Sequence, residues 1–210
     1  MTELFNYQRR QSTDVRVGNS GIGGENPIRV QSMATVDTND TEGGAAQAKR
    51  IIDAGGELVR FTTQGTREAN NMKNISDRLK GDGYQAPLVA DVHFNPNVAD
   101  VAALYCEKVR INPGNYVDPA RTFKELEYTD EEYAAELKKI DERFVPFLNI
   151  CKANNTAVRI GVNHGSLSDR IMSRYGDTPE GIVESCMEFL RICKRENFDN
   201  VVISIKASNT

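Results

Sequence analysis

The feature that most constrains the fold of this sequence is the alternation of short aliphatic runs with amphipathic helical patterns. Six runs have the length and composition of strands, at residues 28–33, 57–62, 87–94, 108–112, 157–163 and 200–208. Helical patterns lie between most of them, at residues 42–56, 67–83, 96–105, 122–144 and 178–198. Strands that alternate with helices predict βα units and a parallel sheet, so we expect an α/β fold.

Side-chain parity within the strands separates the possible parallel architectures. In residues 108–112, Val109 and Ile111 face one way, whereas Arg110 and Asn112 face the other. The same separation recurs in most of the other strands. A doubly wound sheet is covered by helices on both faces and needs apolar side chains on both, which these strands lack. One apolar and one polar face predict a (β/α) barrel of the TIM type, with its site at the carboxyl-terminal ends of the strands.

The predicted barrel is truncated, because a closed one has eight strands and this chain stops after the sixth run. An open sheet edge favours self-association. The glycine-rich stretch at residues 17–27 precedes a strand and lacks lysine, so we expect an amino-terminal hairpin across the barrel bottom rather than a phosphate loop. The expected organisation is a hairpin region at 1–27, a partial barrel at 28–210, and an acidic helical insertion at about 122–144 within it.

The charge pattern limits the classes of partner. Residues 122–144 hold eight acidic and four basic residues, which accounts for the whole formal net charge of −4. The remaining chain has no long-range field for nucleic acid, so an anion must be bound by a local cluster. The acidic run, opened by a capping box from Thr129 to Glu132, is typical of a solvated helix face. No membrane span or targeting segment is visible, so we expect a cytoplasmic protein with no membrane contact.

Four cations share inward parity and a position toward the strand ends, namely Arg60, Arg110, Arg159 and Lys206. Arginine binds phosphate oxygens in pairs and lysine adds a point charge, so the set predicts a diphosphate site. The alternative is that these cations pair with nearby carboxylates, namely Asp91, Glu57 and Glu107.

Two histidines and a neighbouring carboxylate have the chemistry for substrate binding or proton transfer. Asp91 and His93 suit a substrate hydroxyl or a proton relay, with a satisfied barrel-mouth histidine as the alternative for His93. His164 follows a strand on a loop, where plain exposure is the alternative. Gly165 and Ser166, the next two residues, offer backbone donors for phosphate.

Three asparagines near the strand ends suit hydroxyl recognition, namely Asn112, Asn115 and Asn163. Asparagine beside glycine and proline is also a common turn residue, so both interpretations stay open. The four cysteines, at 106, 151, 186 and 193, show no CxxC pattern. Cys186 and Cys193 fall on the apolar stripe of a predicted helix, which favours small buried hydrophobes over metal ligands.

Five stretches carry a resemblance to a known enzyme family: RRQSTDVRVGNSGIGGENPIRVQSM, PLVADVHF, KVRINPGN, RIGVNHGSLSDRIMSRYG and SIKAS. Over nearly its whole length the chain resembles the 4-hydroxy-3-methylbut-2-enyl diphosphate synthases of the methylerythritol phosphate route to isoprenoids. The segments NHGSLSDRIM and YTDEEY are similar to the long form found in plants and some bacteria.

The resemblance implies an iron-sulfur oxidoreductase that reductively opens 2-C-methyl-D-erythritol 2,4-cyclodiphosphate, with two electrons passed through a [4Fe-4S] cluster from flavodoxin or ferredoxin. It implies a substrate pocket built from Arg60, Asp91, Arg110, Arg159, Asn163 and Lys206, with His93, Asn112, Asn115 and His164 nearby. The catalytic residues are unassigned, and the candidates are Asp91, His93 and His164. In the family the cluster cysteines lie beyond the region matched here, so we expect this chain to lack the iron-sulfur domain, to bind no cluster and to be inactive alone.

Two other functions are compatible with the strand-end cations. A Schiff-base aldolase would use Lys206 as its amine nucleophile, with neighbouring cations lowering the pKa of the amine. A non-catalytic phosphate-binding module would use the cations for binding only.

Overall fold

The computed structural model describes residues 10–118 and 127–208, and within them six strands form one parallel sheet. The strands are β3 (Gln31–Met33), β4 (Leu58–Thr63), β5 (Leu88–Val92), β6 (Lys108–Ile111), β7 (Ala157–Asn163) and β8 (Val201–Lys206). Each strand pairs in parallel with the next one along the chain. This sequential order is that of a (β/α) barrel, and six strands make a half-barrel. The predicted fold class is confirmed.

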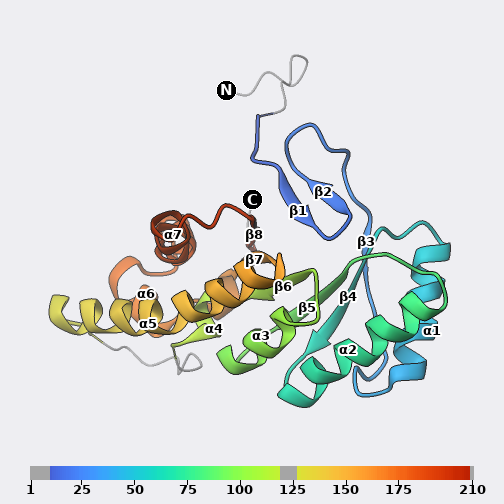
Figure 1. Cartoon of the computed structure of the whole chain (residues 1–210). Coiled ribbons are helices and arrows are strands. Elements are labelled where there is room, and N and C mark those ends of the chain that lie inside the picture. The colour runs from blue at the N-terminus through green and yellow to red at the C-terminus, as the bar shows by residue number, and fades with distance from the viewer. Residues whose placement is uncertain (1–9, 119–126, 209–210) are drawn as a thin grey trace.

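Helices follow the strands and pack against the sheet, with α2, α3 and α5 lying side by side in Figure 1. The helices are α1 (Thr41–Asp53), α2 (Thr66–Gly81), α3 (Pro96–Ala103), α4 (Pro113–Tyr116), α5 (Asp130–Asn154), the 3-10 turn η1 (His164–Ser166), α6 (Asp169–Tyr175) and α7 (Pro179–Arg195). The short α4, η1 and α6 follow strand ends, where the sequence predicted only loops. They shape the mouth of the half-barrel.

The capping box predicted from Thr129 to Glu132 is confirmed, whereas residues 127–129 of the predicted acidic insertion are not helical. Thr129 caps α5 by accepting a hydrogen bond from the amide of Glu132, and Thr178 caps α7 by accepting one from the amide of Gly181. Helix α5 continues to Asn154, beyond the predicted end at 144, because its later turns bury apolar side chains against the sheet. Residues 122–126 of the predicted acidic insertion lie outside the described residues.

The main core lies between the sheet and the helices. It contains the strand side chains that face away from the barrel interior. The side chains of Val109 and Ile160 are fully buried in it. Between α4, α5 and α7, the rings of Tyr116, Phe144 and Phe189 meet edge to face at centroid distances of 5.0–5.8 Å. Such contacts add about 0.5–1.5 kcal/mol each to the burial of the rings. The interior face is left for polar side chains.

A hairpin of β1 (Val15–Val17) and β2 (Ser20–Ile22) covers the amino-terminal ends of the strands (Figure 1). Its buried side chains, Val15 and Val17, form a second small core with the inward-facing Leu58, Val89 and Ala157. The turn needs Gly18, whose φ of +57° lies in the left-handed region. The glycine-rich stretch therefore contributes an apolar plug at the barrel bottom and no phosphate loop.

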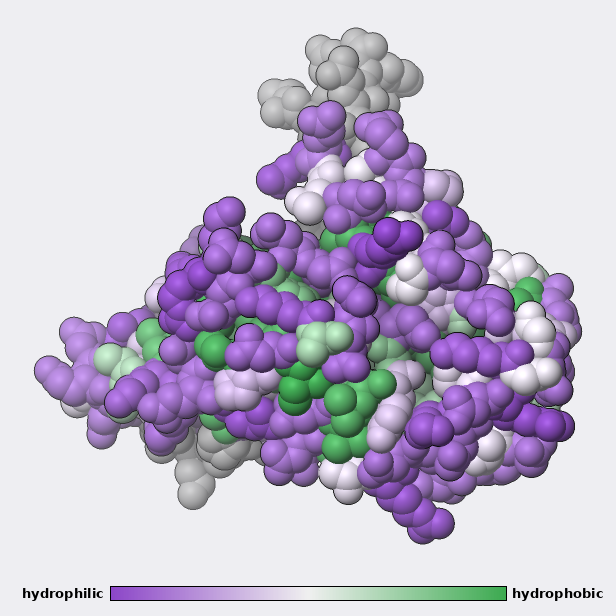
Figure 2. Space-filling model, in the orientation of Figure 1, coloured by the Kyte–Doolittle hydropathy of each residue, from purple (hydrophilic) through white to green (hydrophobic). Residues whose placement is uncertain are grey.

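Both edge strands of the half-barrel expose apolar side chains. Ile28 before β3 is 88 % exposed, and Ile203 and Ile205 on β8 are about half exposed. By contrast, the helix-covered face in Figure 2 is mostly hydrophilic, with a small hydrophobic area near its middle. Closed barrels pair such edges with further strands. None of the helices described between residues 10 and 208 is long and apolar enough to cross a bilayer.

Candidate functional site

Asp91 on β5 is the centre of a charge cluster inside the half-barrel. This residue is 1 % exposed. Arg60 from β4 pairs with its Oδ2, and Nη1 of Arg110 from β6 donates to its Oδ1 at 3.3 Å. Nε2 of His93 lies 2.9 Å from Oδ2. The cluster forms because alternate side chains of neighbouring parallel strands face inward, and Asp91 is in register with Arg110. Three of the predicted site residues thus meet on one carboxylate.

Asp91 is held as a carboxylate. Burial by itself would raise the pKa of this group, but the hydrogen bonds from His93 and Arg60 and the charges of Arg60 and Arg110 lower the pKa well below its usual range. A group that is ionised throughout the neutral range is a poor proton donor. The geometry therefore favours a role for Asp91 in fixing the two guanidinium groups.

Arg159 on β7 is the third inward arginine and is in register with Arg110. Its Nε donates to Oγ of Ser204 at 2.8 Å, and no carboxylate within the described ranges forms an ion pair with it. Burial, together with the charges of Arg60 and Arg110, lowers the pKa of Arg159 to about 10. The side chain is therefore still protonated at neutral pH. Its charge is thus not paired with a carboxylate of its own among the described residues.

Several polar atoms of this cluster are buried without a hydrogen bond inside the described chain: Nε of Arg60, Nε of Arg110 and Oδ1 of Asn112. An unpaired buried donor or acceptor costs about 1–3 kcal/mol. These atoms belong to residues predicted for the substrate pocket. Two of the three are cationic donors, which are suited to an anionic ligand.

Gly161 makes room for Arg110, a role that was not predicted from the sequence. Nη2 of Arg110 donates to the carbonyl oxygen of Gly161 at 2.8 Å. A Cβ atom at position 161 would lie 2.5 Å from Nε of Arg110, closer than real contacts allow. The glycine in RIGVN therefore allows the guanidinium group to cross the inner face of β7.

The segments NPGN and NHGS, at residues 112–115 and 163–166, meet at the barrel mouth. Nδ2 of Asn112 donates to Oγ of Ser166 at 2.8 Å, and Oδ1 of Asn163 accepts from the amide of Gly165 at 3.3 Å. A Cβ atom on Gly114 would lie 1.7 Å from the carbonyl oxygen of Ser166, so only glycine permits this approach. The segment PGN, where the sequence left a turn open, is the start of α4, in which Asn115 is half-buried.

His164 and Lys206 are among the predicted site residues that make no recorded contact with the Asp91 cluster. Nε2 of His164 lies 2.5 Å from Oδ1 of Asp177, and its Nδ1 lies 3.4 Å from Oγ of Ser208. The alternative of a plainly exposed His164 is therefore wrong, because this side chain is held by a carboxylate. Lys206 is exposed at the end of β8, in register with Asn163, and forms no ion pair within the described ranges.

Of the three carboxylates proposed as alternative partners for the cations, only Asp91 forms ion pairs with them in the described chain. Glu57 pairs with Arg29 at 2.7 Å, and Glu107 lies 3.7 Å from Lys80, both near the amino-terminal ends of the strands. The inward arginines therefore outnumber the inward carboxylates of the described chain.

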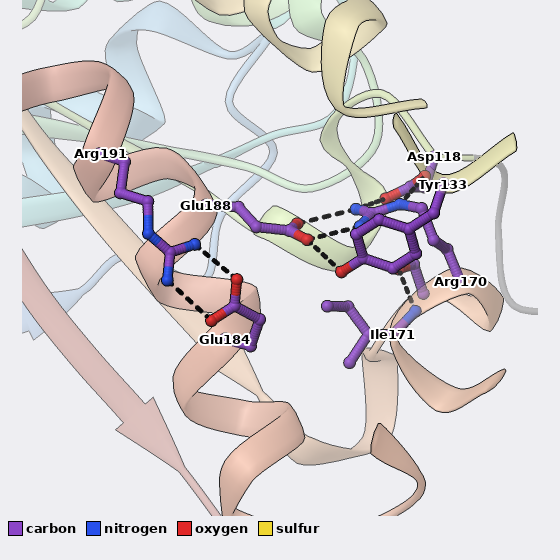
Figure 3. A network of polar contacts seen from close by, with 8 residues as sticks. Asp118, Tyr133, Arg170, Ile171, Glu184, Glu188 and Arg191 are labelled. Atoms are coloured by element: carbon purple, nitrogen blue, oxygen red, sulfur yellow. Dashed lines mark hydrogen bonds and ion pairs between the residues drawn. The ribbon is translucent and has the colours of Figure 1, made fainter. Parts of the chain in front are cut away.

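A buried ion network supports the mouth from the helix side (Figure 3). Arg170 on α6 is 2 % exposed and donates to Glu188 of α7 at 2.5 and 2.8 Å. It also donates to Asp118 at 3.1 Å, and its guanidinium group lies 4.7 Å from the ring centre of Tyr133 on α5. The network joins three helices behind the NHGS segment. Sequence reasoning missed it, because Arg170 carries no periodic signal.

The four cysteines do not fit an iron-sulfur cluster. All are buried, and none belongs to a group of three or more metal-ligating side chains in the described ranges. Burial raises the pKa of Cys186 to about 11 and, as the main cause, that of Cys193 to about 12. A cluster ligand has to be a thiolate. The prediction that Cys186 and Cys193 are buried on the apolar stripe of α7 is confirmed.

A separate cavity of about 610 Å³ lies at the opposite end of the strands. Its lining includes Arg16, Asn155 and Asn200, which lie near the hairpin and the amino-terminal ends of β7 and β8. Active sites of (β/α) barrels lie at the carboxyl-terminal ends, so the Asp91 cluster is the stronger candidate site.

The fold and the cluster together define a TIM-type half-barrel with three inward-facing arginines around one buried carboxylate. The family model described as the GcpE TIM-barrel domain matches residues 12–210, and the chain belongs to this family. The resemblance found in the sequence motifs is thereby confirmed.

Curated bacterial relatives named 4-hydroxy-3-methylbut-2-en-1-yl diphosphate synthase (flavodoxin) match almost the whole chain. The protein of Bacteroides fragilis is 74 % identical over 99 % of this chain. That of Protochlamydia amoebophila is 52 % identical over 98 %. The matches cover 33 % and 32 % of those two relatives, so the chain spans about a third of their length.

A solved structure with a similar fold is the phospho-2-dehydro-3-deoxyheptonate aldolase of Thermotoga maritima. The TM-score is 0.55 and the identity is 12 %, and the match covers 95 % of this chain and 48 % of the aldolase chain. At this identity the likeness concerns the barrel fold alone.

Proposed function

We propose that this chain is the substrate-binding half-barrel of a 4-hydroxy-3-methylbut-2-en-1-yl diphosphate synthase and that its inward cations bind 2-C-methyl-D-erythritol 2,4-cyclodiphosphate. The observation that carries the proposal is the charge imbalance of the interior. Arg60 and Arg110 share one carboxylate and each keeps an unpaired buried donor, and Arg159 has no carboxylate partner among the described residues. A diphosphate supplies the missing negative charge and matches guanidinium geometry.

In this function the chain binds and orients the substrate. Asp91 holds Arg60 and Arg110 in place before the ligand arrives, and Gly161 allows Arg110 to lie flat against β7. The asparagines at the mouth fix the loops through which the substrate enters. In the synthases the reducing electrons come through a [4Fe-4S] cluster, and the relatives' names point to flavodoxin rather than ferredoxin as the donor.

The proposal predicts the outcome of an affinity series. Binding of the cyclic diphosphate to the 210-residue chain, measured by calorimetry, should weaken roughly ten- to hundredfold in Arg110→Met and in Arg159→Met. Each change removes a charge-assisted contact worth about 1.5–3 kcal/mol. Arg191→Met is the control, because Arg191 is more than half exposed on α7 and pairs with Glu184 outside the site. Unchanged affinity in Arg159→Met would refute the proposed site.

The same measurements address Lys206 and the aldolase alternative. Lys206→Arg should bind more tightly than Lys206→Ala, because only the charge matters for phosphate. Borohydride with a carbonyl substrate should leave no adduct on Lys206, since a Schiff-base lysine needs a desolvated site and this residue is exposed. A covalent mass on Lys206 would favour the aldolase.

A second prediction concerns the cluster. The 210-residue chain, reconstituted anaerobically with iron and sulfide, should hold no stoichiometric [4Fe-4S] centre, because its cysteines are buried and belong to no group of three or more metal-ligating side chains among the described residues. The measurement is the cluster absorbance per chain, with Cys186→Ser as the comparison. A stable band that disappears in Cys186→Ser would contradict the prediction.

We further expect the exposed apolar edges at β3 and β8 to be covered by self-association or by added barrel strands.

A further inference from the structure

Lys108, the first residue of β6, is a cation deep inside the half-barrel. It has the inward parity of Arg110 and lies two residues closer to the amino-terminal end of the strand. The residue is 3 % exposed. Its register neighbours, Val89 on β5 and Ala157 on β7, belong to the apolar plug at the barrel bottom. Lys108 therefore lies at the boundary between this plug and the arginines above.

The surroundings of Lys108 offer it no negative charge. Its Nζ donates to Oε1 of Gln31 on the edge strand β3 at 3.0 Å, and no described carboxylate forms an ion pair with it. The charged groups that act on it are Arg60 from β4 and Arg159 from β7, both cations. The one nearby inward carboxylate, Asp91, is engaged by Arg60, Arg110 and His93.

This environment disfavours the charged form of the lysine. Burial, with added repulsion from Arg159 and Arg60, lowers the pKa of Lys108 to about 8. Near that pH the empty barrel holds the amine partly neutral. A bound anion would reverse the balance, because an opposite charge favours the ammonium form. The flexible four-carbon stem allows Nζ to turn from Gln31 toward a ligand.

We propose that Lys108 is the deepest phosphate-binding residue of this site and takes up a proton from solvent when a diphosphate binds. The neutral amine becomes an ammonium group and donates to a phosphate oxygen, so that one proton leaves the solvent and no covalent bond changes. This inference rests on the proposed function, because it requires an anion beside Arg159. It adds to that function a binding residue and a proton-coupled step.

Inorganic pyrophosphate is the probe for the test. Calorimetric titrations of the 210-residue chain near pH 8, in Tris and in HEPES, give the number of protons exchanged on binding, because the two buffers differ in ionisation enthalpy. The wild-type chain should take up about half a proton more per pyrophosphate than Lys108→Met, since near its pKa half of the lysine is neutral. Subtracting the variant cancels the titration of pyrophosphate itself. The difference should fall toward zero near pH 6.

Affinity supplies an independent readout. Pyrophosphate should bind roughly ten- to hundredfold more weakly to Lys108→Met. Lys108→Arg should retain most of the affinity and lose the extra proton uptake, because arginine is charged beforehand. Lys138→Met, on the exposed side of α5, is the matched control and should change neither quantity. Without pyrophosphate, Lys108→Met should resist urea at least as well as the wild type, because a buried cation without an anion has been removed.

The outcomes separate the two proposals. If the wild type binds pyrophosphate and Arg159→Met weakens it, but Lys108→Met matches the wild type in affinity and proton count, the role of Lys108 is wrong and the proposed site stands. If the wild type binds no pyrophosphate or cyclic diphosphate, both fail. A Lys108→Met chain that unfolds more easily, while Lys108→Arg keeps the wild-type proton count, overturns the inference in favour of a structural role.

Discussion

Replacing Arg170 with methionine should lower the free energy of unfolding by about 3–5 kcal/mol, because the change leaves buried carboxylates without their partner. Glu188 and Asp118 are 5 % and 8 % exposed, and both accept hydrogen bonds from this guanidinium group. Burial alone would lower the pKa of Arg170, but the hydrogen bonds that it donates to Glu188 and Asp118, and the charges of these two carboxylates, raise it. Urea unfolding at neutral pH measures the loss.

Arg191→Met is the matched control for this prediction, because Arg191 and its partner Glu184 lie on α7, the helix that also carries Glu188 (Figure 3). Arg191 donates to Glu184 at 2.5 and 3.0 Å, yet its side chain is 57 % exposed. An exposed pair contributes about 0–1 kcal/mol, so the control should stay close to the wild type. Equal losses in the two variants would show that burial does not set the strength of the network. Neutralising Glu188 and Asp118 together with Arg170 should recover part of the loss.

The network also links stability to the site. Two residues separate the end of η1 from the start of α6, and Ser166 of η1 accepts a hydrogen bond from Asn112. Loss of Arg170 would free α6 from α5 and α7 and loosen the NHGS segment. We expect the pyrophosphate affinity of the Arg170→Met chain to fall in proportion to the displacement of the NHGS segment.

Most of the fold could be predicted from the sequences of the strands. In KVRIN and AVRIGVN the alternation of apolar and polar side chains is a local property, and it determines which face is covered by helices. The capping residues Thr129 and Thr178 act within one helical turn, so they too could be predicted. Inward parity also put Arg60, Asp91 and Arg110 on one face of the sheet, and left their pairing open as an alternative to anion binding.

What the sequence did not predict depends on contacts between distant segments. Arg170 binds Asp118 and Glu188, which are 52 and 18 residues away, and no spacing rule connects them. Gly114 and Gly161 are needed because of close approaches that form only after the strands have paired. A Cβ atom at these positions would lie 1.7 and 2.5 Å, respectively, from its nearest neighbour. A turn at PGN stayed open in the sequence, because proline is common both in turns and at the first position of a helix.

Lys108 is a different kind of omission. Its inward parity is as visible in KVRIN as that of Arg110, but only cations nearer the strand ends were assigned to the site. A lysine at the beginning of a barrel strand can extend its amine into solvent where the barrel bottom is open. The hairpin prevents this by placing Val15 and Val17 beneath the strands. Burial of Lys108 thus follows from a segment some ninety residues earlier in the sequence.

Replacing Asp91 with asparagine should destabilise the empty barrel by about 3–5 kcal/mol at pH 7, because Arg60 and Arg110 lose the carboxylate that compensates them. Asp77→Asn is the control, since Asp77 is 60 % exposed and pairs with Lys73 within α2. Its effect should stay below about 1 kcal/mol. Urea unfolding of both variants at pH 7 measures the difference.

The pH dependence of the Asp91 effect tests its cause. The folded-state pKa of Asp91 lies below the unfolded value of about 3.9, so its contribution is complete above pH 4 to 5 and is lost as pH falls toward the folded-state pKa. The stability gap between the wild type and Asp91→Asn should therefore narrow on acidification below about pH 4. A gap that stays constant down to pH 2 would show that lost packing, and not lost charge, causes the effect.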